Sequence, residues 1–148
     1  MNGFELASII EKDSKLANNV VGIYSFDTIP KNFGNHKGLI FNNEISSRSG
    51  SHWLSLFKIN ANTIEFYDSF GLDPEVYGLS SEHPFLQKYN IIYRNKQIQS
   101  IDSEICGLYA IYYLEHRVLG HPLSAIFEKF GEDYYLNDKI IINHYAKI

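Results

Sequence analysis

The chain has 148 residues, a length that suits one domain with a sizeable core, so a multidomain machine is excluded. Hydrophobic residues make up 45% and charged residues 20%, which is close to a globular average and excludes a disordered chain. Lys and Arg total 13 and Asp and Glu total 17, which leaves a formal net charge of -4. The overall charge therefore gives no indication of a basic surface that would bind nucleic acid or an anionic membrane.

Targeting signals and domain boundaries are absent from the sequence pattern. No apolar run approaches the ~18 residues of a membrane span, and the N-terminus lacks a charged segment followed by an apolar run. No repeat, low-complexity tract or Pro-rich or Gly-rich linker divides the chain. We therefore expect residues 1–148 to form a single domain that is made and used in solution and is not secreted.

The first half of the chain is predicted to be mostly strand. Apolar residues at helical spacing predict a short amphipathic helix over Phe4–Lys12. The β-rich runs Val20–Phe26 and Gly38–Phe41 predict two strands separated by a loop. The runs Trp53–Ile59 and Thr63–Asp68 flank three turn-forming residues and predict a β-hairpin.

In the second half, we predict a loop with a short helix over Asp73–Tyr89, a strand over Ile91–Tyr93 and a polar connection over Gln97–Ser103. Three helices are predicted to follow, over Glu104–Val118, Leu123–Phe130 and Ile140–Tyr145. The helix that begins at Glu104 is apolar on nearly all sides, which predicts burial on most of its surface. Ser103 or Asp102 is the expected cap. Strands and helices are segregated without βαβ alternation, so the predicted class is α+β.

Cys106 is the only cysteine, which excludes an internal disulfide and a multi-thiolate zinc site. It falls in the first turn of the predicted helix, where free backbone N–H groups and the helix dipole favour a thiolate. Gly107 follows directly. A glycine there either lets a substrate backbone approach the sulfur or lets two helices pack closely, and both interpretations stay open.

A thiol hydrolase also needs a base, and His52 is the best candidate among six histidines. It opens the first hairpin strand beside the only tryptophan, Trp53, after residues 46–51, which we expect to be flexible. If the hairpin turns near Ala61, Asp68 returns approximately to the level of His52. A carboxylate there would fix the tautomer of His52, although Asp68 is equally plausible as a residue of a strand-ending turn.

A side-chain donor for the developing oxyanion completes the set that such chemistry requires. Gln97 and Gln99 both lie in the polar connection before the Cys106 helix, and the residues alone do not choose between them. The backbone N–H of Cys106 is a second candidate donor.

In order and spacing, these residues resemble the adenain-like cysteine proteases, which are the adenovirus maturation protease and its relatives in Polinton/Maverick elements, virophages and some large DNA viruses. The ubiquitin-like-protein proteases are more distantly similar. The resemblance covers about Phe4 to Leu119 and rests on four motifs taken together: His52-Trp53, Tyr67-Asp68-Ser69-Phe70-Gly71, Gln99, and Cys106-Gly107-Leu108-Tyr109.

The resemblance implies a papain-related α+β fold, with a central mixed or antiparallel sheet packed on helices and the reactive cysteine at a helix N-terminus. It implies four roles, with His52 as general base, Asp68 as its orienting partner, Gln99 as oxyanion donor and Cys106 as nucleophile. Gln99 is selected over Gln97 because the seven-residue step to the cysteine matches the family. Trp53 and Gly107 are the candidate substrate-contacting residues.

The resemblance also implies cleavage of viral capsid or core precursor proteins, typically beside glycine. Such a protein would act as a monomer in the virion or in the cytoplasm or nucleus of the host cell. No metal or cofactor is expected. The adenovirus enzyme is activated by a disulfide-linked peptide and by DNA. An activating peptide would have to bind here without that disulfide, and the acidic charge argues against DNA binding. Residues 122–148 match nothing in the family.

Three alternative functions remain open at this point. A protease that removes ubiquitin-like modifiers would share the same order of residues. An acetyltransferase of the same fold family would use Cys106 as an acyl carrier. In a non-catalytic binding domain, Cys106 would be a core residue, although the intact four-part set argues against that interpretation.

Overall fold

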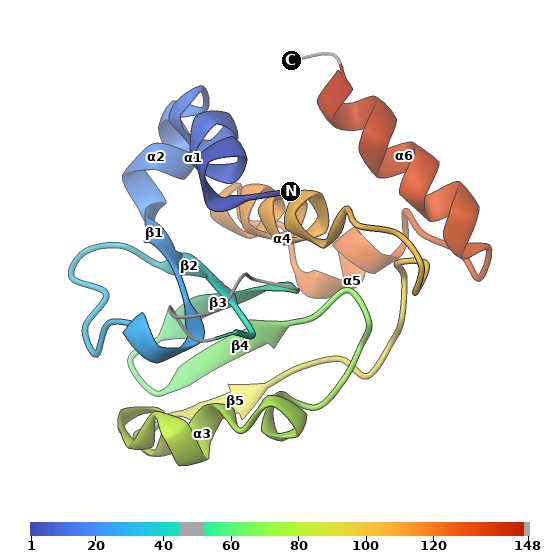
Figure 1. Ribbon diagram of the computed structural model, residues 1–148. Coiled ribbons are helices and arrows are strands. Elements are labelled where there is room, and N and C mark those ends of the chain that lie inside the picture. The colour runs from blue at the N-terminus through green and yellow to red at the C-terminus, as the bar shows by residue number, and fades with distance from the viewer. Residues whose placement is uncertain (45–51, 147–148) are drawn as a thin grey trace.

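The computed structural model describes residues 1–44 and 52–146 (Figure 1). The helices and 3-10 turns are α1 (Gly3–Glu11), α2 (Ser14–Asn19), η1 (Phe26–Thr28), η2 (Pro74–Tyr77), α3 (Leu79–Glu82), η3 (Pro84–Lys88), α4 (Cys106–Val118), α5 (Leu123–Phe127) and α6 (Tyr134–Ala146). The strands are β1 (Val20–Tyr24), β2 (Gly38–Asn42), β3 (Trp53–Asn60), β4 (Thr63–Tyr67) and β5 (Asn90–Ile92). The expected flexible run of residues 46–51 lies outside the described residues.

The five strands form one mixed sheet in the order β1-β2-β3-β4-β5. The central pairs, β2 with β3 and β3 with β4, are antiparallel, whereas each edge strand lies parallel to its neighbour. Together with the helices packed against it, this mixed sheet confirms the predicted α+β class. None of the helices in the described part of the chain is long and apolar enough to cross a membrane.

The β3–β4 hairpin forms where it is predicted. Ser55 pairs with Tyr67 and Lys58 with Ile64, and the register shifts near the turn, between Lys58 and Asn60. Continuing the Ser55 to Tyr67 pairing by one step places position 54 opposite Asp68, so His52 is two residues from direct pairing with Asp68. That offset keeps their side chains within reach across the strand ends.

Two apolar clusters cover the two faces of the sheet. One face packs against α1, α2, α4, α5 and α6, with fully buried residues that include Leu6, Tyr109 and Tyr113. The other face packs against η1, α3 and η3, around Phe41 and Phe66. Figure 1 shows α3 on the opposite side of the sheet from α1, α2, α4 and α6. Helix α4 is buried nearly all round, as its sequence predicts.

The start of α4 differs from the prediction. The helix begins at Cys106, its N-cap is Ile105, and no side chain caps it. The expected capping side chains are engaged elsewhere, because Ser103 Oγ donates to the carbonyl of Ser100 and Asp102 accepts from the Ser100 hydroxyl. These bonds fold the approach into a turn and delay the helix by two residues from Glu104.

The C-terminal helices also differ in length from the prediction. Helix α5 ends at Phe127, because Phe130 turns inward to contact the rings of Tyr109 and Tyr112. Helix α6 begins at Tyr134, six residues before the predicted Ile140. Its first two turns bury polar side chains, which a search for apolar periodicity does not detect.

Candidate active site

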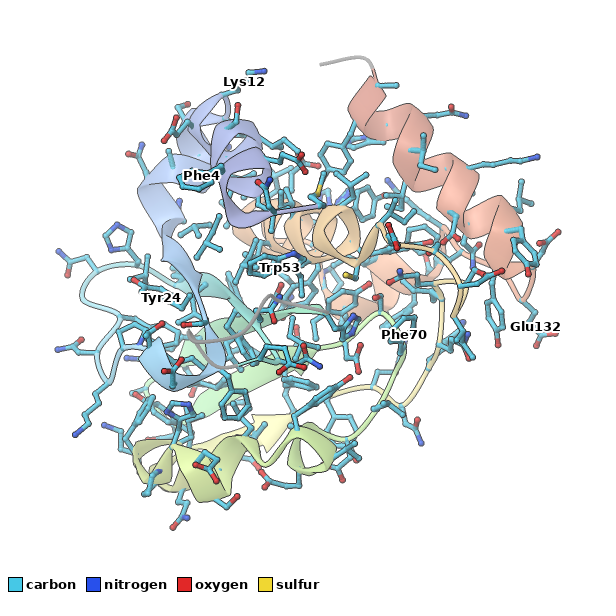
Figure 2. All side chains as sticks on the ribbon, viewed as in Figure 1. Phe4, Lys12, Tyr24, Trp53, Phe70 and Glu132 are labelled. Atoms are coloured by element: carbon cyan, nitrogen blue, oxygen red, sulfur yellow. The ribbon has the colours of Figure 1, made fainter. Side chains whose placement is uncertain are left out.

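Cys106 is the first residue of α4, and its side chain lies beside the start of β3. The residue is 7% exposed, and the backbone N–H of Trp53 donates to its Sγ at 3.4 Å. Trp53 marks this place in Figure 2. The first backbone N–H groups of any helix lack helical partners, so the sulfur lies at a site that favours negative charge.

His52 and Asp68 form a buried pair, with His52 Nε2 2.6 Å from Asp68 Oδ1. Both residues come from strand ends, since His52 precedes β3 and Asp68 follows β4. The ring of Phe70 stacks on the imidazole at 4.4 Å between centroids, and Asn43 Oδ1 accepts from the backbone N–H of His52 at 3.0 Å. Nε2 faces Asp68, and interaction with Cys106 also contributes to the raised pKa of His52.

The carboxylate of Asp68 accepts hydrogen bonds at both oxygens. Oδ1 also receives the backbone N–H of Phe70 at 2.9 Å, and Oδ2 receives the backbone N–H of Leu72 at 3.3 Å. The hydroxyl of Tyr77 donates to Oδ2 at 2.6 Å. These donors stabilise the ionised carboxylate and fix its orientation toward His52. Asp68 therefore has both roles that the sequence leaves as alternatives: it belongs to the turn that ends β4, and it is the partner of His52.

The electrostatics of the pair favour a proton on His52 and a negative charge on sulfur. Burial lowers the pKa of His52, but its hydrogen bonds with Asp68 and Cys106 and their negative charges outweigh burial and raise it to about 9. Burial raises the pKa of Cys106, but hydrogen bonds from His52 and from the backbone N–H of Trp53 lower it below its ordinary value. The site therefore supports a thiolate–imidazolium pair.

Gln99 is completely buried and hydrogen-bonded within its own surroundings. Its Oε1 accepts from the hydroxyl of Ser69, and its Nε2 donates to the carbonyl of Ser103 at 3.1 Å and to Ser103 Oγ at 2.9 Å. Gln97, the alternative donor, bonds the backbone carbonyl of Gln99 at 2.9 Å. The structure thus brings together His52, Asp68 and Cys106 by direct contacts and holds Gln99 in the segment that leads to α4.

Trp53 and Gly107 form the contact between the site and α1. The indole N–H of Trp53 donates to the backbone carbonyl of Met1 at 3.0 Å. A Cβ on Gly107 would lie 2.7 Å from Leu6 Cδ2 and 3.2 Å from Trp53 Cδ1. Close packing of α4 against α1 therefore gives a physical reason for the glycine.

Sequence patterns assign no role to Tyr77, Asn43 or Ser69, although Ser69 belongs to the motif around Asp68. Tyr77 donates to Asp68 and also stacks on the imidazole of His52, with ring centroids 6.2 Å apart. The signal for Tyr77 is local, because Asp73 followed by Pro74 is a typical start of a helical turn, and that turn carries Tyr77 back over the strand ends. The contacts of Ser69 with Gln99 and of Asn43 with His52 depend on loop conformations, which local sequence rules do not predict.

Within residues 1–44 and 52–146, no group of three or more His, Cys, Asp or Glu side chains is arranged to hold a metal ion. Beside Cys106, the imidazole of His52 and the carboxylate of Asp68 are already bonded to each other.

Comparison with known proteins informs the fold. The central domain of the uncharacterized Lpg1148 protein from Legionella pneumophila is similar, with a TM-score of 0.52 and 13% identity over 86% of this chain and 84% of that one. The ASFV pS273R protease matches with a TM-score of 0.37 and 20% identity over 56% of this chain and 35% of the protease. No protein-family model and no curated protein matches the sequence. Membership of the adenain-like group therefore stays a prediction.

Proposed function

We propose that this protein is a cysteine endopeptidase. The observation that carries the proposal is the grouping of Asp68, His52 and Cys106 at the start of a buried helix: Asp68 lies 2.6 Å from His52 Nε2, and His52 lowers the pKa of Cys106. A nucleophile, a base in contact with it and a third group that orients the base are the requirements for nucleophilic catalysis of acyl transfer.

The reaction follows from these contacts. The Cys106 thiolate attacks the scissile carbonyl carbon, and the protonated His52 gives its Nδ1 proton to the departing amine as the C–N bond breaks. A thioester remains on Sγ. Water, deprotonated by His52, then attacks the thioester, releases the carboxylic acid and restores the thiolate–imidazolium pair. Asp68 holds the ring in the tautomer that both transfers require.

The oxyanion would be stabilised by the backbone N–H of Cys106, with Gln99 as the proposed side-chain donor. Both protons of the Gln99 amide are bonded to Ser103 in this structure. Donation to a substrate oxygen therefore requires the bond to the Ser103 hydroxyl to be exchanged for a bond to the substrate. Such an exchange keeps the number of hydrogen bonds constant.

We propose glycine-containing sites in viral capsid or core precursors as the substrates, cleaved by a monomer in the virion or the infected cell. The resemblance in residue order motivates this choice, and the geometry adds support. The sulfur belongs to a residue that is 7% exposed and lies beside Trp53. A glycine backbone reaches a buried sulfur with the least steric conflict, because it has no Cβ.

The test compares wild type with Cys106→Ala on three substrates. These are a panel of glycine-containing peptides, a ubiquitin-like modifier with a fluorogenic C-terminal amide, and acetyl-CoA. Cleavage of the peptides that disappears in Cys106→Ala supports the proposal. Faster turnover of the modifier, or acetylation of Cys106, would assign one of the alternative functions. Cleavage that persists in Cys106→Ala would show that the nucleophile is wrong.

A further inference from the structure

Helix α6 buries two adjacent polar side chains that the proposed chemistry does not use. Asn137 is 1% exposed and Asp138 is 7% exposed. Buried polar groups are tolerated only when their hydrogen bonds are made, so the partners of these two residues show what they do. Two of the four partner residues, Ile98 and Ser100, lie in the segment that leads to Cys106.

Asn137 joins two separate pieces of backbone. Its Nδ2 donates to the carbonyl of Ile98 at 3.0 Å and to the carbonyl of Gly131 at 2.9 Å. Its Oδ1 accepts from the backbone N–H of Gly131 at 3.0 Å. The amide thus uses both its donors and its acceptor, and it ties the residue before Gln99 to the turn that precedes α6.

Asp138 joins the same segment to helix α4. Its Oδ1 accepts from the hydroxyl of Tyr109 at 2.7 Å and from the backbone N–H of Ser100 at 3.4 Å. Tyr109 is completely buried and lies three residues after Cys106 in α4. One carboxylate oxygen therefore sets the distance between the residue after Gln99 and the first turn of the helix that carries the sulfur.

The opposite side of the segment is bound to the turn after β4. The backbone N–H groups of Ile98 and Gln99 both donate to the carbonyl of Ser69, at 2.9 and 3.2 Å. Ser69 directly follows Asp68. The backbone around Gln99 is thus held between the Asp68 turn on one side and helix α6 on the other. Figure 1 shows the connection from β5 to α4 passing close to the first turn of α6.

Because residues 98–100 are held from both sides, we propose that Asn137 and Asp138 are positioning residues. They hold residues 98–100 so that Gln99 and the backbone N–H at the start of α4 can both donate to the same substrate carbonyl oxygen. The inference rests on the proposed peptidase function. It assigns a role in the reaction to the C-terminal segment, which the resemblance in sequence does not cover. Neither residue contacts the reacting atoms.

Hydrogen exchange tests, without any substrate, whether Asn137 and Asp138 hold residues 98–100 in place. In Asn137→Ala and Asp138→Ala, the amides of Ile98, Gln99 and Ser100 should exchange at least about tenfold faster, while amides in the middle of α4 keep their protection. Asn143→Ala is the matched control, because Asn143 lies on the exposed side of the same helix. Unchanged exchange at residues 98–100 would overturn the proposal, and so would equal loss of protection throughout α4.

Kinetics then separate positioning from general support of the fold. Because iodoacetamide alkylation uses the thiolate and needs no oxyanion donor, its rate and pH profile should stay within about twofold of wild type in the Ala variants. Peptide hydrolysis should lose about 10- to 100-fold in kcat with little change in KM. Asp138→Asn, which keeps an acceptor for Tyr109 and Ser100, should recover most of that loss.

The two possible failures are distinguishable. If kcat and the alkylation rate fall together, or if kcat stays at the wild-type value in both Ala variants, the positioning role is wrong. If the wild-type chain hydrolyses no peptide although its thiol reacts rapidly, the peptidase function is wrong, and the exchange data still decide whether α6 holds the segment.

Discussion

His52 is bonded to Asp68 at 2.6 Å and lowers the pKa of Cys106, whereas Gln99, seven residues before Cys106, makes its side-chain hydrogen bonds with Ser69 and Ser103. The proton-transfer half of the site is therefore assembled by direct contacts between side chains from three elements. The oxyanion half depends on how a loop is held. A direct contact is lost only when one of its two side chains is removed. The position of a loop is also lost when a distant residue that bonds to the loop is changed.

The largest expected effect comes from breaking the direct half. His52→Ala should lower kcat/KM for a cleavable peptide by about 10³-fold, because it removes both the base and the partner that lowers the pKa of Cys106. In alkylation by iodoacetamide, the apparent pKa of the thiol should rise in the variant. His36→Ala, in the loop before β2, is the control. Equal pH profiles for wild type and His52→Ala would refute the contact.

Gln99→Ala should give a smaller and different loss. We expect kcat to fall about 100-fold, as for one missing oxyanion donor, while the alkylation profile stays that of wild type. Stopped-flow acylation and iodoacetamide kinetics on the same preparation measure both quantities. If the alkylation profile shifts as it does in His52→Ala, the proton-transfer half and the oxyanion half of the site are not independent of each other.

Gly107→Ala examines the packing that places α4 against α1. The new Cβ would meet Leu6 Cδ2 at 2.7 Å and Trp53 Cδ1 at 3.2 Å. Overpacking of a buried contact costs about 1–3 kcal/mol, which should appear as a lower free energy of unfolding in urea. Gly131→Ala is the matched control, because a Cβ there meets no described atom within 4 Å. Similar losses in both variants would show that the contact is not the cause.

The smallest effect concerns a histidine far from the site. His116 in α4 is 8% exposed, and burial followed by the charges of Lys129, His121 and His144 lowers its pKa to about 4. The unfolded chain, with a pKa near 6.5, then binds more protons between pH 6.5 and 4. Stability should therefore fall as pH falls through that window, by about 1 kcal/mol between pH 7 and 5.5.

Urea unfolding at several pH values measures this contribution. His116→Asn should flatten the pH dependence between pH 7 and 5.5, because asparagine does not titrate there. His83→Asn is a suitable control, since His83 Nε2 lies 2.6 Å from the carbonyl of Phe26, on the other face of the sheet. An identical slope in wild type and His116→Asn would assign the pH dependence to other groups.

The sequence predicts well where a local rule applies. The β3–β4 hairpin follows from two β-rich runs around turn-forming residues, and its register brings Asp68 near His52. Helix α4 follows from its apolar surface. These features depend on neighbours in the chain, so periodicity and turn chemistry suffice to find them.

Prediction failed where polar side chains make long-range contacts. Ser103 looks like a helix cap but bonds Gln99 and Ser100 instead, which moves the start of α4 to Cys106. Asn137 and Asp138 look like surface residues, and their burial depends on partners about 30 to 40 residues away. The parallel pairing of β1 with β2 also has no local signature. Each of these requires the tertiary fold to be known first.

Trp53 gives the protein an internal optical reporter. It is the only tryptophan, its backbone N–H donates to Cys106 Sγ, and its indole N–H bonds the carbonyl of Met1. Indole emission responds to the charge and polarity around the ring. The intrinsic fluorescence of the unlabelled chain should therefore change when the sulfur gains or loses its charge, and again when an acyl group occupies it. The free enzyme and the acyl-enzyme would then differ in tryptophan fluorescence intensity, so a turnover could be followed in real time without a label.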